Sequence, residues 1–306
     1  MASNVAVKQT IDYDQSMWYV TWIAFRNHKG ALVGAAVLGV IVFAVLIGPF
    51  IYTVDPQYVD LSIKNQGFSA DHLLGTDNLG RDLFAQLLAG GRIALAVGLS
   101  AMLLSLFFGT LIGVLAGYFR MLDGPLMRFT DLFLALPLLP LLLVIILLFR
   151  DVLRAAIGPE AGIFLLIVFV IGVTSWMQTA RIVRGETLSL KEREFVKAAV
   201  SVGASNWSIV FRHILPNMLS PIMVSATLGV ANAIITESTL SFLGLGFPPD
   251  FPTWGRLLFD GANFITLAPE RVIWPGLAIS LVVLSVNYIG DALRDAIDPR
   301  RRQLTV

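Results

Sequence analysis

The sequence predicts an all-α membrane protein with six transmembrane helices. Of its 306 residues, 56% are hydrophobic and only 14% are charged, whereas soluble domains usually carry about a quarter charged residues. Six stretches hold no Asp, Glu, Lys or Arg, and each is close to the roughly 20 residues that a helix needs to cross a bilayer. They are residues 30–54, 93–119, 132–149, 161–180, 214–236 and 272–290. Buried helices of a large soluble protein are the alternative, but six such lengths in one chain make it a poor explanation.

Each stretch is expected to be helical because lipid offers the backbone no hydrogen-bond partner. A closed barrel would alternate apolar and polar residues, and residues 141–149, LLLVIILLF, do not alternate. Pro137 and Pro140 in the third stretch, and Pro221 in the fifth, are expected to kink their helices. The first stretch is too long, and too far from the start, for a cleavable signal peptide. The chain contains no cysteine, which excludes a disulfide framework and a thiolate metal site.

The distribution of basic residues predicts that both chain ends lie in the cytoplasm. With six spans the two ends share a side, and that side then holds 15 of the 22 Lys and Arg residues, as the positive-inside rule requires. The outer side is left with Lys64, Arg81, Arg92, Arg150, Arg154, Arg256 and Arg271. Residues 17–25, MWYVTWIAF, mix Trp and Tyr with apolar side chains and are expected to form an interfacial helix.

This topology divides the chain into three parts. Residues 1–29 are a cytoplasmic N-terminal segment with the interfacial helix, residues 30–295 are the six-span transmembrane domain, and residues 296–306 are a cytoplasmic tail. Outer loops are expected near residues 55–91 and 247–270. The longest inner segment between spans covers residues 181–213, between the fourth and fifth spans.

That inner segment is expected to form two helices that meet at Gly203 and lie parallel to the membrane surface. Ser205 is a good N-cap for the second helix, and Pro216 marks the point where the chain enters the membrane. Apolar residues recur at helical spacing on both sides of the glycine: Phe195, Ala198, Ala199 and Val202, then Trp207, Val210, Phe211 and Ile214. A helix pair that merely anchors to lipid headgroups would show the same periodicity.

Residues 194–217, EFVKAAVSVGASNWSIVFRHILPN, resemble the EAA loop of permease subunits of ABC importers. Lys197 stands in place of the usual Glu and His213 in place of the usual Ile, and both departures resemble the peptide and nickel branch of that family. The positions that match are Ala198, Ala199, Gly203, Leu215 and Pro216. Three more segments resemble that branch in the same order: residues 72–82, HLLGTDNLGRD, residues 237–246, ESTLSFLGLG, and residues 290–300, GDALRDAIDPR.

The resemblance implies a type I importer permease that is not itself an enzyme. Such a subunit works in the inner membrane with a homologous second permease, two cytoplasmic ATPases that hold ATP and Mg²⁺, and an extracytoplasmic substrate-binding protein. No phosphate-binding G-x-x-x-x-G-K-[ST] motif occurs in this chain, so no cofactor is expected on it, and no nucleic-acid partner. Di- or oligopeptides are the expected substrate, with nickel or its chelates as the alternative. A transporter driven by ion gradients fits less well, because the spans are nearly free of mid-membrane charges.

The resemblance also implies a coupling loop at residues 185–216 that inserts into a groove on an ATPase. Gly203 would let the backbone turn sharply and approach the partner closely, and basic residues around it would set orientation more than affinity. The candidate coupling residues are Glu194, Lys197, Ala198, Ala199, Gly203, Ala204, Ser205, Trp207 and Arg212.

Three carboxylates are candidates for the outer part of the translocation path. Gly75 and Gly80 are expected to allow a turn that presents Asp77 and Asp82 near the binding protein or an outer gate; a calcium loop is not expected, because the ligand spacing is wrong. Glu237 lies about 20 residues into the fifth span, roughly 30 Å along a helix and hence near the outer surface. It is expected either to reach water or to face the interface between the two permeases. The three histidines fall on opposite sides of the membrane, so no metal site is expected from them.

Overall fold

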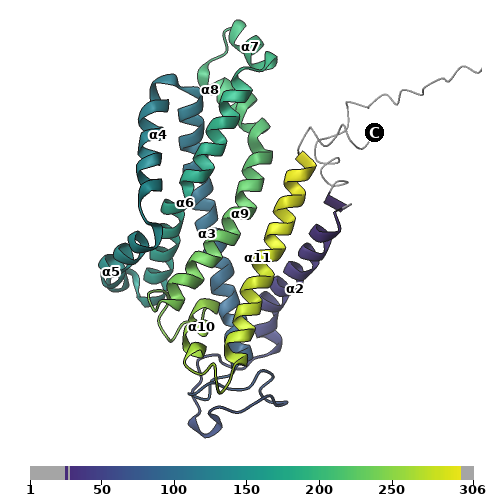
Figure 1. Ribbon diagram of the computed structural model, residues 1–306, viewed down its shortest axis with the longest axis vertical. Helices are drawn as coiled ribbons and strands as arrows, with labels where there is room; N and C mark the ends of the chain where they lie inside the picture. Colours follow the sequence, from purple (N-terminus) through teal and green to yellow (C-terminus); the bar gives the residue numbers. More distant parts are fainter. Residues whose placement is uncertain (1–24, 27, 298–306) are drawn as a thin grey trace, which may run out of the picture.

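The computed structural model describes residues 25–26 and 28–297, and Figure 1 shows them as long helices side by side. Five segments are long and apolar enough to cross a membrane: α2 (Lys29–Ile51), α3 (Leu83–Tyr118), α6 (Pro159–Lys191), the segment Asn206–Phe242, which ends in α9 (Leu219–Phe242), and α11 (Glu270–Ile297). A sixth span is the bent pair α4 (Arg120–Ala135) and α5 (Leu138–Ile157). The all-α, six-span architecture expected from the sequence is therefore confirmed. The predicted interfacial helix up to residue 24 and the basic residues 300–302 lie outside the described residues.

The third span is broken rather than kinked. α4 ends at Ala135, Pro137 is the N-cap of α5, and the two helices meet at 87°. A proline lacks the N–H that would continue the helix and its ring crowds the preceding turn. The first part of this span, α4, begins at Arg120, well before the uncharged stretch 132–149. Its Asp123 and Asp131 pair with arginines of α6.

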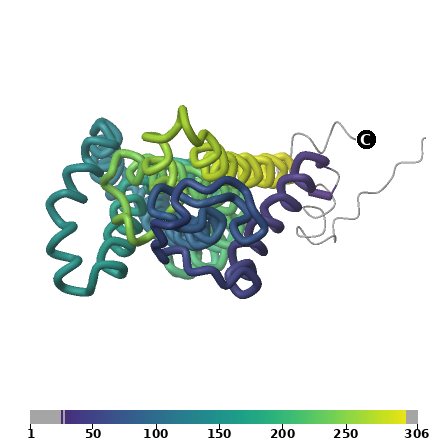
Figure 2. The backbone as a smooth tube through the Cα atoms, turned by 90° about the horizontal axis from the view of Figure 1, so that it is seen from below, coloured from purple at the N-terminus to yellow at the C-terminus, as the bar shows by residue number. Residues whose placement is uncertain are grey.

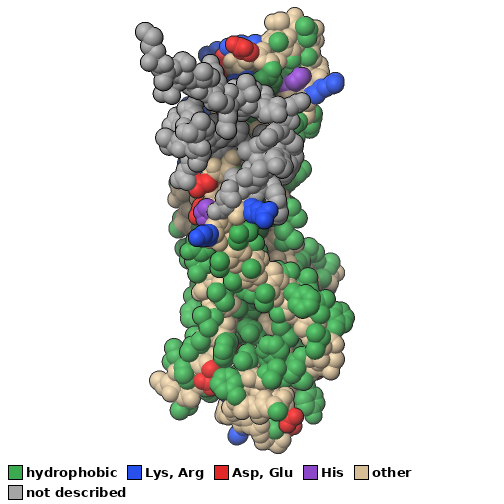
Figure 3. All heavy atoms as spheres, turned by 90° about the vertical axis from the view of Figure 1, so that its right-hand side faces the viewer, with side chains coloured by type: hydrophobic (Ala, Val, Ile, Leu, Met, Phe, Trp, Pro, Cys, Tyr) green, Lys and Arg blue, Asp and Glu red, His purple; other side chains and the backbone are tan. Residues whose placement is uncertain are grey.

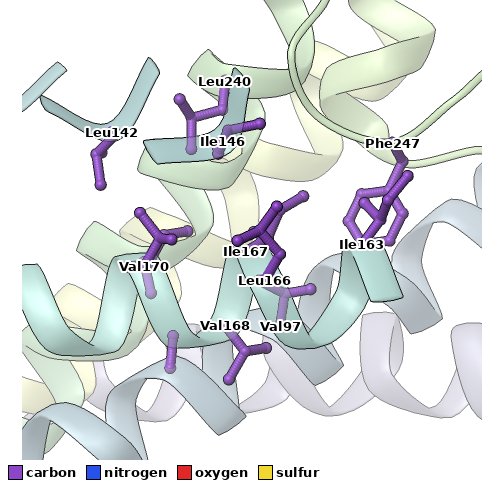
Figure 4. Close-up of a cluster of buried hydrophobic side chains, with 13 residues drawn as sticks. Val97, Leu142, Ile146, Ile163, Leu166, Ile167, Val168, Val170, Leu240 and Phe247 are labelled. Atoms are coloured by element: carbon purple, nitrogen blue, oxygen red, sulfur yellow. The ribbon is translucent and has the colours of Figure 1, made fainter. Parts of the chain in front are cut away.

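α3 and α6 form the central pair of the bundle, and small residues allow their close approach. A Cβ added at Gly109, Gly113 or Gly117 of α3 would lie 2.6 Å from an atom of α6. Small residues at such interfaces let helix backbones pack closely in a membrane. Near the other end of α6, Ile163, Ile167 and Val170 belong to a cluster of buried apolar side chains that also takes in α5 and α9 (Figure 4).

The two ends of the bundle carry the shorter elements. At one end lie α7 (Glu194–Ser201) and α8 (Asn206–Ile209), followed by a π-helical turn, η2 (Val210–Ile214), and a 3₁₀ turn, η3 (Leu215–Met218). At the other end lie α10 (Trp254–Ala262) and the loop that contains η1 (Leu61–Ile63), which covers the bundle in Figure 2. Figure 3 shows one face of the molecule, where hydrophobic side chains form a broad band between charged groups near the two ends.

Arg92 lies ten residues inside α3, not in the outer loop as predicted. Pro49 lies in the last turn of α2, and because proline has no N–H, the carbonyl of Val45 loses its helical partner. Arg92 Nε donates to that carbonyl at 2.9 Å and Nη2 donates to the Leu46 carbonyl at 2.7 Å. The guanidinium therefore satisfies backbone groups that lipid cannot satisfy, which explains a charge at this depth.

Candidate functional site

The segment from α7 through α8, residues 194–209, forms a compact projection that we call the α7–α8 tip (Figure 1). Gly203 has φ +79°; its N–H donates to the Val200 carbonyl at 3.0 Å, and the Ala204 N–H donates to the Ala199 carbonyl at 3.1 Å. These two bonds make a Schellman motif, which requires a left-handed residue at the position of Gly203. Ser205 Oγ accepts from the Ser208 N–H at 3.3 Å as the N-cap of α8. The expected helix, glycine break and capped second helix are therefore present.

One face of the tip is packed on the subunit's own bundle. Val196 and Ile209 are buried in an apolar cluster with Val183 of α6, and the Tyr118 hydroxyl of α3 donates to Asn206 Oδ1 at 3.0 Å. The helical spacing of apolar residues in the sequence does not predict this face, because Val196 is not one of the periodically spaced apolar residues named above. Ala199, a candidate coupling residue, is also buried in this cluster, and its coupling role stays a prediction.

The opposite face of the tip exposes large apolar side chains. Val202 is 84% exposed and Trp207 is 55% exposed, and the Trp207 ring stacks on Phe211 with centroids 5.9 Å apart. Phe195 and Val200 are exposed as well. Of the other candidate coupling residues, Ala204 is half-buried, and the exposed ones are Glu194, Lys197, Ala198, Gly203, Ser205 and Arg212. Lys197 Nζ lies 2.9 Å from Glu192 Oε2, and this hydrogen bond lowers the pKa of Glu192.

At the other end of the bundle, Asp77 organises a tight turn. Its Oδ1 accepts from the N–H groups of Leu79 and Arg81 at 2.7 and 2.9 Å, and its Oδ2 accepts from Arg81 Nε at 2.7 Å. Gly75 and Gly80 both have positive φ, as expected for the turn. The Asp77 carboxylate is buried by these internal contacts, and its role near the binding protein or an outer gate stays a prediction.

Asp82 is likewise turned inward and serves as the N-cap of α3. Its Oδ1 accepts from the Ala85 N–H at 2.7 Å, while its Oδ2 accepts from the Tyr52 hydroxyl at 2.7 Å and lies 2.9 Å from His72 Nδ1. Burial, together with the hydrogen bond to Asp82, raises the pKa of Tyr52 to about 12. Arg271 of α11 then holds the loop from the other side, since its Nη2 donates to the Thr76 carbonyl at 2.9 Å.

Glu237 is fully buried within the chain, so in this conformation it does not reach water, as one of the two expectations had it. It is 0% exposed within the chain, and its Oε1 accepts from the Ser241 hydroxyl at 2.7 Å. The Ser238 hydroxyl donates to Glu237 Oε2 at 3.4 Å. Gly255 lets α10 sit against α9, because an added Cβ would lie 2.5 Å from Ser238 Cα. Gly255 thus allows α10 to pack against the part of α9 where Glu237 is buried, and the role of Glu237 at an outer gate stays a prediction.

A groove of about 360 Å³ opens between the helices α3, α4, α5, α6 and α9, and we call it the polar groove. Its lining combines apolar side chains with neutral hydroxyl and amide groups, and none of the lining residues is charged. The polar members are Ser105, Thr174, Ser175, Gln178, Thr179, Ser225, Asn232 and Thr236. We did not identify these residues from the sequence, although Ser225, Asn232 and Thr236 recur at helical spacing within the otherwise apolar fifth span.

Comparison with known proteins identifies the family. Residues 109–303 match the family described as binding-protein-dependent transport system inner membrane component, and residues 16–67 match the N-terminal TM domain of oligopeptide transport permease C. The chain is 38% identical to the dipeptide transport system permease protein DppC of Alkalihalophilus pseudofirmus, over 94% of this chain and 91% of that protein. It is 36% identical to the oligopeptide permease protein OppC of Bacillus subtilis, with the same coverage.

One further relative and one solved structure extend this result. The glutathione transport system permease protein GsiD of Pectobacterium atrosepticum is 38% identical over 92% of this chain and 91% of that protein. A chain of the MetNI methionine ABC transporter, in a structure with inward-facing conformations, has a TM-score of 0.56 and 17% identity, covering 70% of this chain and 97% of that one, and it shows a shared fold. The chain therefore belongs to the family of inner-membrane components of binding-protein-dependent transport systems.

Proposed function

We propose that the polar groove is this subunit's half of the pathway through which an ATP-driven importer moves di- or oligopeptides. The observation that carries this proposal is the neutral hydrogen-bonding lining of the groove. A peptide backbone offers N–H and C=O groups at every residue, whatever its side chains. Uncharged hydroxyl and amide groups pair with such a backbone without selecting particular side chains.

The same lining argues against nickel as the substrate. Nickel prefers imidazole, thiolate or carboxylate ligands, and none of the residues that line the groove is His, Cys, Asp or Glu. The names of the relatives point the same way, since they are permeases for dipeptides, oligopeptides and glutathione.

Energy for transport would enter through the α7–α8 tip. Its exposed apolar side chains, Phe195, Val202 and Trp207, suit insertion into a groove on an ATPase subunit, as in helix-in-groove recognition. Val196 and Tyr118 attach the tip firmly to α6 and α3, so that a movement of the tip would move the helices that line the polar groove. ATP and Mg²⁺ would be bound by two separate ATPase subunits, and a second permease would complete the pathway.

This function requires the tip, and both chain ends, to lie in the cytoplasm. The chain has no native cysteine, so single cysteines report orientation without background. Cysteines introduced at Ser3 and Gln303 should resist an impermeant thiol reagent in intact cells, while one at Ser69, on the exposed outer loop, should react once any outer membrane is permeable. Labelling of Ser3→Cys or Gln303→Cys from outside would contradict the orientation.

Uptake by the reconstituted importer tests the groove directly. We expect Asn232→Leu to lower the uptake of a radiolabelled peptide severalfold, because it removes one of the neutral polar groups of the lining. Thr239→Val is the matched control on the same helix, since its hydroxyl donates to its own backbone at Ile235, 2.8 Å away, and does not line the groove. Equal uptake by both variants, or transport of nickel in place of peptide by the wild type, would overturn the proposal.

A further inference from the structure

A pair of opposite charges stands beside the polar groove at the end nearest α7. Arg181 Nη2 of α6 donates to Asp131 Oδ1 of α4 at 2.5 Å. Arg181 comes three residues after Gln178 and directly before Ile182, and both of these line the groove. Residues three apart share one face of a helix, and at 1.5 Å rise per residue Arg181 lies about 4.5 Å further along α6 than Gln178.

The Arg181–Asp131 pair is open to other partners. The side chains of Arg181 and Asp131 are 54% and 59% exposed, and a single hydrogen bond joins them. Exposed pairs of this kind contribute little to stability. Opening the pair therefore costs the subunit little.

A second pair between the same two helices shows the contrast. Arg184 Nε and Nη2 donate to the two oxygens of Asp123 at 2.5 and 2.8 Å, and these side chains are 33% and 29% exposed. Such two-point contacts between guanidinium and carboxylate are strong and directional. Arg184 and Asp123 thus already hold α4 against α6, which leaves Arg181 and Asp131 without an obvious structural task.

A peptide in the groove would meet its first full charges at this pair. The lining itself is uncharged, and Glu237, which follows the lining residue Thr236, is fully buried and bonded to Ser241. A peptide carries an ammonium group, a carboxylate and sometimes charged side chains. Each of these is costly to move out of water into a passage whose lining offers no opposite charge.

We propose that Arg181 and Asp131 exchange their mutual contact for the charged groups of a peptide that leaves the groove, and so form a charge-selective exit site. This inference rests on the proposed peptide-import function. Arg181 favours the passage of carboxylates and Asp131 favours the passage of ammonium and guanidinium groups. Removing either charge therefore changes the relative rates for acidic and basic peptides in opposite directions.

The test compares two tripeptides, alanyl-glutamyl-alanine and alanyl-lysyl-alanine, in proteoliposomes that contain the complete importer with its binding protein. The ratio of their uptake rates is measured for each variant, because a ratio does not depend on how much active complex was assembled. We expect Arg181→Gln to lower the ratio of acidic to basic uptake, and Asp131→Asn to raise it, each by about two- to fivefold, the range that exposed charge pairs supply. Arg181→Lys, which keeps the charge, should restore the wild-type ratio.

Arg184→Gln is the matched control on the same helix. It should change both uptake rates by the same factor, because Arg184 acts on the packing of α4 against α6. Unchanged ratios in Arg181→Gln and Asp131→Asn, or a ratio shift as large in Arg184→Gln, would overturn the exit site while leaving peptide import intact. A wild-type importer that transports neither tripeptide would instead overturn the proposed function.

Discussion

Replacing Gly203 tests whether the α7–α8 tip docks through a close contact at its glycine. Gly203 has φ +79°, and among the described residues nothing lies within 4 Å of a Cβ added there. Within the subunit, a side chain at this position therefore costs only the strain of a left-handed backbone, about 1–2 kcal/mol for an ordinary residue. Asn adopts this conformation more easily than Ala or Leu. Overpacking a tight partner contact would add typically about 1–3 kcal/mol, or roughly one to two decades in affinity.

Backbone strain and a close partner contact predict different rankings of the Gly203 variants by the amount of ATPase that each retains. If the partner packs closely against Gly203, Gly203→Asn and Gly203→Leu should both weaken ATPase retention, and Gly203→Ala should weaken it less. If only backbone strain matters, Gly203→Asn should retain the ATPase nearly as well as the wild type, while Gly203→Ala and Gly203→Leu should retain less of it. Gly39→Leu is a control, since Gly39 is an exposed glycine in the first span, and nothing described lies within 4 Å of its added Cβ.

The assay measures the membrane level of the subunit, the co-purified ATPase and the substrate-stimulated ATP hydrolysis of the reconstituted complex. We expect normal membrane levels for every Gly203 variant, because Gly203 lies outside the membrane-spanning segments. We expect a loss of ATPase retention and of stimulated hydrolysis for Gly203→Asn and Gly203→Leu. Wild-type values for both of these variants would refute the docking contact and leave the exposed apolar face of the tip without a partner.

Three further predictions concern the opposite end of the bundle. Ser241→Ala removes the donor 2.7 Å from the buried Glu237 carboxylate and should lower the free energy of unfolding by about 1–3 kcal/mol, read as a lower melting temperature in detergent. Glu237→Gln should keep assembly but slow peptide uptake, and unchanged uptake with intact assembly would exclude a gate role. The raised pKa of Tyr52, about 12, means that the protonated hydroxyl stabilises the folded state. This contribution to the free energy of unfolding is complete below about pH 10 and is lost as the pH rises toward 12. The absorbance of the Tyr52 tyrosinate is obtained by subtracting the pH titration of Tyr52→Phe from that of the wild type. It should appear well above pH 10, and its appearance near pH 10 would contradict the buried contact with Asp82.

The sequence by itself determined the features that depend on neighbouring residues. Uncharged stretches predict spans because a lipid environment excludes charge from each segment separately. The break at Gly203 and the cap at Ser205 follow from the backbone preferences of those two residues. The turn at Gly75 and Gly80 follows from the same kind of rule, and these features are present in the structure as predicted.

Only the tertiary structure decided where the polar and charged side chains point. Asp77 and Asp82 look exposed in a loop sequence, but contacts with Arg81, Tyr52 and His72 turn them inward. Glu237 is buried because α10, which follows it in the chain, folds back over the end of α9. These outcomes depend on which distant segments come together, and no local pattern records that.

The same reason explains why the polar groove was missed. Its lining comes from five helices, and its few Ser, Thr, Asn and Gln residues are divided among three of them, α3, α6 and α9, each of which is otherwise apolar. Arg92 was placed in a loop because a lone arginine normally marks the end of a span, yet the carbonyls near Pro49 of α2 give it partners within the membrane. Sequence determines which segments enter the bilayer, whereas the contacts between them decide which polar groups can be satisfied there.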